Sequence, residues 1–458
     1  PNTDTLTNQQ PTRAAILRAI ETHLVRPVHK DDIVFYYFAG HGAQVPNAAS
    51  DEPDRLDESI VPADSRRGAP DIRDKELRPL FNRILESGAH LTLLLDHCHS
   101  AGGFRRWPRG RARGIAPAPP IIDRRDYGPR PDARGALILA SAQDFEIAFE
   151  ASGEDGRVHG AFTWAWIRAM RDAVNGEAAQ ETFLRAQARL RGERPDQTPA
   201  MFGNAESKRR PFLGMSTDRN AERAVIAVET VLPDGEVVLQ GGWAHGLAVD
   251  SELRPIGDPL ARLRVTRLLG VGRSLARVSS GRTSSVIRSG ALFEIPPRGA
   301  DGWSSLTPPH APAPYHLAVL DERTKQIVRD AIVFGRRIYS IVLRTSGPSL
   351  ERLFPRYYYV FVVDSRGNSH LVFPKTGSSE NRFPIRGRAF AEIALGGPSA
   401  FRISRPYGVD TYFLLSTEEP LPNPSILEWD GVRARRALGP TPWSIERITL
   451  ESVAPRRR

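Results

Sequence analysis

The sequence predicts an α/β domain with a mostly parallel β-sheet flanked by helices, followed by two β-rich domains. In the N-terminal half, three short apolar runs do not alternate with polar residues, which is typical of strands covered on both faces. These runs are residues 33–38, 91–95 and 137–140. Helical stretches at about 75–86 and 160–173 suit the crossover connections of a parallel sheet. After about Gly214, short strand-like runs alternate with turn signals, which indicates β-hairpins.

The chain has 458 residues, of which 40% are hydrophobic, and this is enough for about three domains. Apolar residues in segment 12–24 share one helical face, and Thr12 is in position to cap that helix. The Pro-rich stretch 296–314 indicates a boundary within the β-rich half. We expect an α/β domain at 1–214, a small β-barrel-like module at 215–312 and a β-sandwich-like module at 313–458.

The composition excludes several classes of protein and site. Cysteine occurs once, so this chain alone cannot build a disulfide framework or a multi-thiolate metal site, and we expect no metal and no cofactor. No apolar run approaches the roughly 18 residues that a membrane span needs. The net charge is +10, but only five of the 63 basic residues are lysines, and the arginines are scattered through every segment. We therefore expect no nucleic-acid partner.

The chain begins with Pro1 rather than methionine, which indicates a fragment or a processed product. We expect a cytoplasmic protein. Whether a signal peptide lies upstream is left open.

Two polar residues follow predicted parallel strands at the edge where open α/β sheets bind ligands. His41 follows the first apolar run, and Cys98, the single thiol of the chain, follows the second run 57 residues later. A neighbouring imidazole that takes and returns the thiol proton makes cysteine a peptidase nucleophile. The alternatives are a buried cysteine that packs as a small apolar residue and a Gly-His-Gly stretch that is only a turn. Together, the two residues predict a catalytic Cys98–His41 dyad.

Six ordered motifs surround these two residues. They are Tyr37–Gly42, the acidic stretch Asp51–Asp64, Asp96–Ser100, Gly135–Glu150, His159–Thr163 and Gln197–Pro199. Over about residues 12–214 this set resembles the caspase-like cysteine peptidases, closest to metacaspases. The resemblance implies that His41 and Cys98 form the dyad and that the backbone N–H groups of Gly42 and Cys98 form the oxyanion hole.

Asp96 predicts the substrate preference. Residues i and i+2 of a strand share a face, so Asp96 points to the same side as Cys98. A carboxylate beside the nucleophile favours a cationic side chain in the S1 pocket and repels aspartate. An aspartate that caps a helix or orients a turn is the alternative. Metacaspases cut after Arg or Lys, and the resemblance also places Ala39, where they often have serine, in this pocket.

The chain also departs from that family at its N-terminus and at the calcium site of some members. Family members normally begin with a strand and a helix ahead of the equivalent of Pro1, so we expect this chain to lack the first strand and helix of the domain. Arg73 and Arg105 fall near two acidic positions of the calcium site of some metacaspases, which leaves Asp74 without its partners. We therefore expect no strong calcium dependence. The acidic residues 51–58 are expected to form a solvated loop, with weak cation binding as the alternative.

Residues 104–134 carry nine arginines and six prolines and show no periodicity, which predicts an exposed, mobile loop. Related enzymes have the linker between their large and small subunits at this position. A peptidase that prefers arginine would meet the loop at a high effective concentration, so self-cleavage is a hypothesis and an unprocessed linker is its alternative. The candidate sites are Arg109, Arg111, Arg113, Arg124 and Arg125.

The C-terminal half resembles uncharacterised β-rich modules found after bacterial caspase-like domains, through motifs in 358–373 and 406–417. It carries no nucleophile or metal signature, and we interpret it as a partner-binding or targeting appendage. The sequence as a whole predicts a cysteine endopeptidase that cleaves protein or peptide substrates after Arg or Lys. The alternative is a catalytically silent caspase-like scaffold whose β domains bind a protein partner.

Overall fold

A computed structural model of the chain shows two compact units, Pro1–Glu222 and Arg223–Arg458. The described residues are 3–7, 10–50, 55–65, 67–97, 116–142, 146–214, 225–242, 245, 247–256, 261–269, 272–280, 287–295, 314–328, 332–334, 338–345, 355–363, 368–374, 381–384, 390–395, 400–402, 409–421, 424, 429–430 and 443–453. In this part of the chain, no helix is long and apolar enough to cross a membrane.

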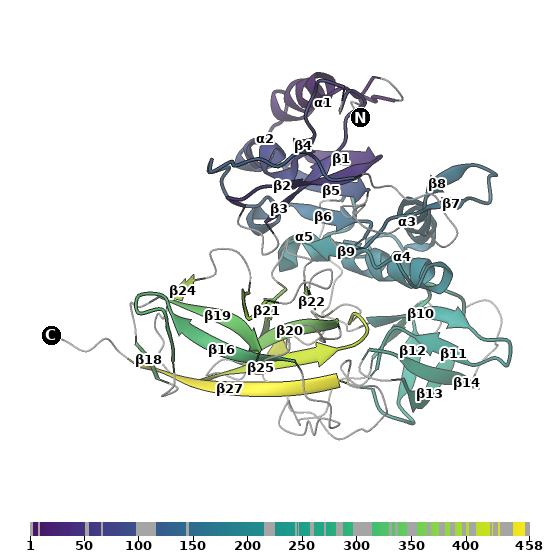
Figure 1. Cartoon of the computed structure of the whole chain (residues 1–458). Coiled ribbons are helices and arrows are strands. Elements are labelled where there is room, and N and C mark those ends of the chain that lie inside the picture. The colour runs from purple at the N-terminus through teal and green to yellow at the C-terminus, as the bar shows by residue number, and fades with distance from the viewer. Residues whose placement is uncertain are drawn as a thin grey trace. The chain divides into compact units, whose positions relative to one another are not determined.

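The first unit is built on a four-stranded sheet in which three neighbouring strands are parallel (Figure 1). Its strands, in spatial order, are β1 (Ile33–Ala39), β5 (His90–Asp96), β6 (Leu137–Ala140) and β9 (Ala200–Phe202). β9 pairs with β6 in the antiparallel direction and was not predicted. The sheet is therefore mixed but mostly parallel, and the three apolar runs of the sequence are its parallel strands.

Helices pack on both faces of this sheet. They are α1 (Arg13–Ala19), the π-helix η1 (Ile20–Val25), α2 (Asp74–Glu86), α3 (Ala161–Asp172) and α4 (Ala179–Glu193). The unit also contains the 3₁₀ turn η2 (Asp132–Arg134) and the short helix α5 (Ala205–Arg209). Leu91 and Leu93 of β5 join one apolar core with α1, η1 and α2, whereas Leu94 joins another with α3 and α4. Burial of each such leucine contributes about 1.5–3 kcal/mol to stability. Thr12 caps α1 by accepting a hydrogen bond from the Ala15 N–H, as predicted.

The prediction that all three parallel strands are covered on both faces is wrong for β1. β1 pairs with β5 alone among the described strands and lies at the edge of the sheet. Ile33, Phe35 and Tyr37 are 42%, 38% and 45% exposed, while Val34 is buried. An apolar run therefore does not distinguish an edge strand with one open face from a central strand.

Small sheets flank the central one. β2 (Gly42–Pro46), β3 (Leu56–Ile60) and β4 (Ile72–Arg73) form an antiparallel sheet that begins directly after His41. β7 (Glu150–Ser152) and β8 (Val158–Gly160) form a hairpin that leads into α3. β2 thus continues from the carboxyl end of β1, and the β7–β8 hairpin leads into the helix whose Thr163 contacts Asp96 at the carboxyl end of β5.

The described part of the second unit is β-rich. Its first six strands form a closed barrel: β10 (Val225–Val231), β11 (Val237–Leu239), β12 (Glu252–Pro255), β13 (Arg262–Leu268), β14 (Ser274–Ser280) and β15 (Leu292–Glu294). The remaining strands form two sheets. One contains β16 (Tyr315–Asp321), β17 (Gln326–Ile327), β19 (Ile338–Thr345), β23 (Glu392–Ala394) and β24 (Ala400–Arg402). The other contains β18 (Ile332–Phe334), β20 (Arg356–Val363), β21 (Asn368–Phe373), β22 (Arg382–Phe383), β25 (Val409–Thr417), β26 (Trp429–Asp430) and β27 (Trp443–Val453).

One apolar core joins these last two sheets. It contains Tyr315, Leu317 and Ile341 from the first sheet and Tyr358 and Leu414 from the second. Alternating residues of β16 supply the core, as expected for a strand with one buried face.

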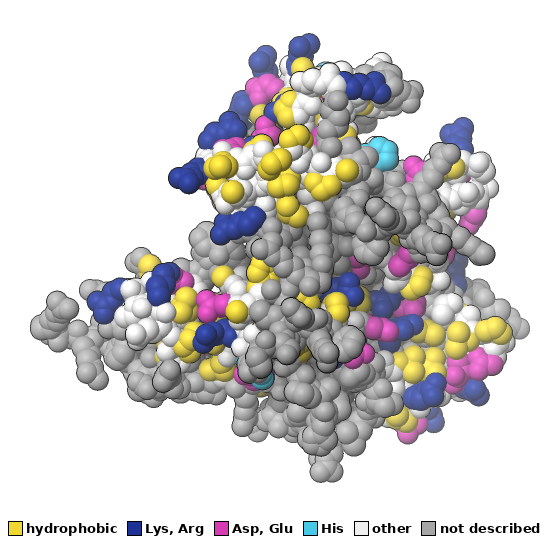
Figure 2. Space-filling view, in the orientation of Figure 1, with side chains coloured by type: hydrophobic (Ala, Val, Ile, Leu, Met, Phe, Trp, Pro, Cys, Tyr) yellow, Lys and Arg dark blue, Asp and Glu magenta, His cyan; other side chains and the backbone are white. Residues whose placement is uncertain are grey.

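On the face of the molecule shown in Figure 2, described basic side chains are dispersed among acidic and hydrophobic ones.

Candidate active site at the edge of the parallel sheet

The carboxyl ends of β1 and β5 lie side by side. Ala39 is the register partner of Asp96, and the Gly40 N–H donates a hydrogen bond to the Asp96 backbone carbonyl at 3.3 Å. The two chain segments that lead to His41 and to Cys98 therefore leave neighbouring strands at the same edge. His41 itself is exposed, and its backbone carbonyl accepts a hydrogen bond from the Val61 N–H at 3.0 Å.

Cys98 lies outside the described residues, so the pairing of its thiol with His41 stays a prediction. Gly42 is the first residue of β2 and pairs with Ile60 of β3. This pairing holds the backbone that follows His41. The oxyanion-hole roles of Gly42 and Cys98 also stay predictions.

The side chain of Asp96 is fully buried, with 0% exposure. Its carboxylate accepts a hydrogen bond from the Thr163 N–H at 3.2 Å and another from the Thr163 hydroxyl. Thr163 is the third residue of α3, so Asp96 caps the N-terminus of this helix from a neighbouring strand. The carboxylate thus makes a helix-capping contact, which is the alternative to a substrate-binding role. The S1 role of Asp96 stays a prediction.

Gly160 and Tyr37 also belong to the surroundings of Asp96 and Thr163. A Cβ atom on Gly160 would lie 1.8 Å from the Asp96 carboxylate, so this position has no room for a side chain. The Tyr37 hydroxyl lies 3.2 Å from Thr163 Oγ1. Ala39, the other predicted S1 residue, is exposed at the end of β1. The motif residues His159–Thr163 were noted in the sequence, but their contact with Asp96 requires the tertiary fold.

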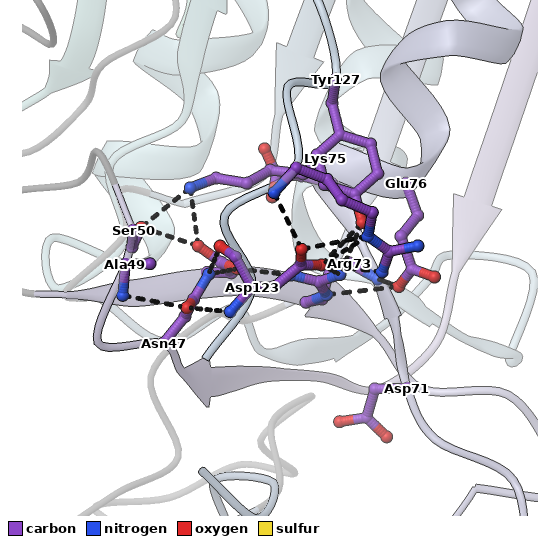
Figure 3. Close-up of polar contacts among 12 residues, drawn as sticks. Asn47, Ala49, Ser50, Asp71, Arg73, Lys75, Glu76, Asp123 and Tyr127 are labelled. Atoms are coloured by element: carbon purple, nitrogen blue, oxygen red, sulfur yellow. Dashed lines mark hydrogen bonds and ion pairs between the residues drawn. The ribbon is translucent and has the colours of Figure 1, made fainter. Parts of the chain in front are cut away.

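A cluster of buried charges lies at the start of α2, apart from the strand ends (Figure 3). The Arg73 guanidinium contacts Asp57 at 2.9 Å, Asp123 at 2.6 Å and Glu76 at 3.3 Å. Lys75 contacts Asp57 at 2.8 Å. The side chain of Asp57 is 0% exposed and that of Arg73 is 6% exposed. Asp57 is therefore a buried strand residue, and the expectation that the whole of 51–58 is a solvated loop is wrong for it.

Hydrogen bonds and charges shift the pKa values of this cluster in a consistent direction. Burial alone would raise the pKa of Asp57, but hydrogen bonds from Lys75, Ser50 and Asn47 outweigh it and hold this pKa below its usual value. Burial likewise opposes the lowered pKa of Glu76, and the Arg13 side chain outweighs it. The cluster is charged at neutral pH.

Segment 116–130 is bound to the rest of the first unit by hydrogen bonds, while most of its residues are exposed. The Ala118 N–H donates to the Gln44 carbonyl at 2.9 Å, and the Ile121 N–H donates to the Pro46 carbonyl at 2.7 Å. These bonds run along the free edge of β2 in the parallel direction, as the Asn47–Ile121 bridge shows. Arg73 then holds Asp123, so this segment is bound by both backbone and side-chain contacts.

The candidate cleavage sites fall into two groups. Arg109, Arg111 and Arg113 lie outside the described residues. Arg124 is exposed, and Arg125 forms an ion pair with Asp123 at 2.8 Å and lies over the Tyr127 ring. The last two therefore lie within the anchored segment 116–130.

The described residues contain no group of three or more His, Cys, Asp and Glu side chains arranged to hold a metal ion. The carboxylates of Asp57, Asp123 and Glu76 all contact the Arg73 guanidinium. Arg73 is thus the cation that these carboxylates bind.

Comparison with known proteins identifies the N-terminal region. A sequence model of the metacaspase, peptidase C14 domain matches residues 1–104. Metacaspase-1A of Aspergillus fumigatus is 43% identical over 95 residues, which are 21% of this chain and 22% of that protein. Metacaspase-1 of Coccidioides immitis is also 43% identical over 95 residues, which are 21% of this chain and 20% of that protein. The chain thus spans about a fifth of the length of the curated relatives it matches.

These matches confirm the resemblance to metacaspases, a family of caspase-like cysteine peptidases, over the region that contains His41, Asp96 and Cys98. A crystal structure of protein GSU0716 from Geobacter sulfurreducens aligns over 45% of this chain and 80% of that chain. Its TM-score is 0.33 and its sequence identity 23%, which is too low to indicate a shared fold.

Proposed function

We propose that the N-terminal unit is a cysteine endopeptidase domain that hydrolyses peptide bonds after Arg or Lys through Cys98 and His41. The single observation that carries this proposal is the register of β1 and β5. Because Ala39 pairs with Asp96, the segments that continue to His41 and to Cys98 start next to each other. The metacaspase match over the same residues supplies the chemistry that fits this placement.

The proposed reaction uses these residues in order. His41 takes the proton of the Cys98 thiol, and the thiolate attacks the carbonyl carbon of the scissile bond. The N–H groups of Gly42 and Cys98 stabilise the resulting oxyanion. The His41 imidazolium then protonates the leaving amine, and water hydrolyses the acyl-enzyme with His41 as the general base.

Asp96 and Ala39 form the S1 pocket in this proposal. Ala39 is small and exposed, so it leaves room at the end of β1 for a long side chain. Asp96 supplies the negative charge that attracts Arg or Lys. The same charge disfavours an acidic P1 residue.

The test is turnover of fluorogenic peptides that end in Arg or in Asp, with the full chain and its Cys98→Ala and His41→Ala variants. We expect the Arg peptide to be cleaved by the wild type and by neither variant. Cleavage of the Asp peptide at a similar rate would contradict the assignment of S1. Turnover that persists in Cys98→Ala would contradict the dyad.

The second candidate function is a silent caspase-like scaffold whose β-rich region binds a protein partner. It is favoured by the size of that region, which includes a closed barrel and two packed sheets. This function predicts no turnover of either peptide and a partner that binds residues 223–458 equally well when Cys98 is replaced.

Self-cleavage extends the peptidase proposal. The anchored segment 116–130 favours Arg109, Arg111 and Arg113 over Arg124 and Arg125, because a peptidase needs a stretch of chain that it can draw into its cleft. Intact mass spectra should show loss of the 50.7 kDa species in the wild type and its persistence in Cys98→Ala. Cuts after Arg124 or Arg125 as the first products would contradict the preference.

A further inference from the structure

The carboxylate of Asp96 is buried at the end of β5, two residues before the proposed nucleophile in the sequence. Removal of an ionised carboxylate from water costs several kcal/mol unless hydrogen bonds replace the lost hydration. Thr163 donates both its N–H and its hydroxyl to the same carboxylate oxygen of Asp96, Oδ2. These two bonds orient this oxygen toward the start of α3.

The start of α3 is shaped to receive this carboxylate. Gly160 is the N-cap residue of α3, and no side chain of the helix itself caps this end. The Asp96 carboxylate occupies the space that a Gly160 side chain would fill, 1.8 Å from the position of a Cβ atom. The N-terminal N–H groups of a helix also favour a negative charge. β5 and α3 are thus fitted to each other through this one group.

The direction of the hydrogen bonds extends the arrangement to β1. A threonine hydroxyl has one proton, and Thr163 gives it to the carboxylate, which can only accept. The Tyr37 hydroxyl must therefore be the donor in its 3.2 Å contact with Thr163 Oγ1. The result is a directed chain from Tyr37 to Thr163 to Asp96.

Tyr37 also lies on the same face of β1 as Ala39, because the two are separated by two positions in one strand. Its side chain is 45% exposed. The chain of hydrogen bonds therefore starts at the surface beside the exposed Ala39 and ends at the buried carboxylate.

We propose that Thr163 is a positioning residue that orients the Asp96 carboxylate toward a basic P1 side chain, with Tyr37 as its supporting donor. The inference rests on the proposed peptidase function and names the residue that sets its specificity. Thr163 acts through Asp96 and takes no part in bond cleavage. Loss of its hydroxyl should weaken recognition of the substrate charge and leave the Cys98–His41 chemistry intact.

Arginine and citrulline peptides separate this role from a general structural one. Citrulline has nearly the shape of arginine but no charge. The ratio of kcat/KM for the Arg peptide to kcat/KM for the citrulline peptide therefore measures how much Asp96 contributes through its charge. We expect Thr163→Val to lower kcat/KM for the Arg peptide about tenfold, mainly through KM, because a hydrogen bond to a charged group is lost. The citrulline peptide should change less than twofold, which is about 0.4 kcal/mol. Thr163→Ser keeps the hydroxyl and should restore the wild-type ratio.

Thr182→Val is the matched control for packing and stability. Thr182 is buried, whereas Thr163 is half-buried, and the Thr182 hydroxyl likewise donates to a carboxylate, that of Glu177, at 3.1 Å. It lies in α4, so its replacement removes an equivalent contact without touching Asp96. Its Arg-to-citrulline ratio should equal that of the wild type. An equal loss for both peptides in Thr163→Val would show a merely structural role and overturn the proposal.

Binding to the Cys98→Ala variant separates this inference from the peptidase function. Calorimetry with the same two peptides measures their binding affinities in the absence of cleavage, and the difference in affinity reports recognition of the substrate charge. We expect Cys98→Ala to bind the Arg peptide at least tenfold more tightly than the citrulline peptide, and the additional Thr163→Val change to reduce this preference. Equal binding of both peptides to Cys98→Ala would overturn the positioning role, whatever the wild type cleaves.

Discussion

Two carboxylates of the N-terminal unit, Asp57 and Asp96, are equally buried, at 0% exposure, yet they are held in different ways. Asp57 lies within β3 and contacts the side-chain cations Arg73 and Lys75. Asp96 ends β5 and receives the amide and hydroxyl of Thr163 at the start of α3. The first carboxylate is part of an ion cluster, whereas the second caps a helix.

A fold can therefore stabilise a buried carboxylate either with cations or with uncharged hydrogen-bond donors. Two cations cancel the charge of Asp57, and the cluster joins β3, α2 and the segment around Asp123 into one structure. The Thr163 amide and hydroxyl are uncharged donors, so these two hydrogen bonds orient the Asp96 carboxylate without adding a positive charge beside it. Asp57 thus suits a structural clamp, and the hydrogen bonds to Asp96 fit the charge recognition that we propose for it.

Replacement of Asp57 should have the largest effect on stability. Asp57→Ala leaves Arg73 and Lys75 buried without their shared carboxylate, which costs about 3–5 kcal/mol. Hydrogen exchange of peptides from β3 and α2 in the full chain measures the local opening free energy. Glu86→Gln is the control, because its ion pair with Arg134 is largely exposed and is worth at most about 1 kcal/mol. Equal effects of the two changes would show that the buried cluster is not a clamp.

Replacement of Arg73 should release the segment that it holds. Arg73→Leu removes the guanidinium from Asp57 and Asp123 and should destabilise the region by about 3 kcal/mol. Trypsin should then cut after Arg124 and Arg125 faster than in the wild type, in a Cys98→Ala background that prevents self-cleavage. Arg134→Leu should leave these rates unchanged. Unchanged rates in Arg73→Leu would show that backbone bonds to β2 suffice.

Gly160→Ala tests the other carboxylate through sterics. The new Cβ would overlap the Asp96 carboxylate, so either the carboxylate or the start of α3 must move, at a cost of about 1–3 kcal/mol. We expect a reduced preference for the Arg over the citrulline peptide, together with faster exchange in the first turn of α3. A variant with wild-type preference and wild-type exchange would contradict the fit between Gly160 and Asp96.

Acidification should reveal the charge of Asp57. Its pKa in the folded chain is held below the ordinary value of about 3.9, so it contributes stability that is fully present above that pH and is lost as pH falls through the folded pKa. The gap in opening free energy between wild type and Asp57→Asn should therefore narrow from pH 6 toward pH 3. If the difference in opening free energy instead widened on acidification, the pKa of Asp57 would be raised in the folded chain, contrary to the lowered value expected here.

The parallel strands could be predicted from sequence because they depend on local pattern. Apolar runs of six and five residues mark β1 and β5, and the residues that follow these runs are the basis of the Cys98–His41 prediction. The edge position of β1 could not be predicted, since strand order depends on pairing partners far along the chain. Its exposed residues Ile33 and Phe35 carry no local signal of exposure.

The contacts of the two buried carboxylates also could not be predicted from sequence, because their partners lie far away along the chain. Asp57 stands in an acidic run that is typical of a solvated loop, and its partner Arg73 is 16 residues away. Asp96 and Thr163 are 67 residues apart. The anchoring of segment 116–130 escapes a pattern analysis for another reason, because backbone hydrogen bonds to β2 do not depend on side-chain periodicity.

Removal of divalent cations should have the smallest effect on activity and stability. It tests whether the Arg73 guanidinium takes the place that a calcium ion would otherwise occupy. In the wild type, the carboxylates of Asp57, Asp123 and Glu76 contact Arg73, so calcium would have to displace a guanidinium that hydrogen bonds hold in place. Activity and exchange rates should be the same with calcium and with EGTA. In Arg73→Gln the same carboxylates face one another with less compensating charge, and calcium should slow exchange there. Calcium stabilisation of the wild type that equals that of Arg73→Gln would show that Arg73 does not take the place of the metal.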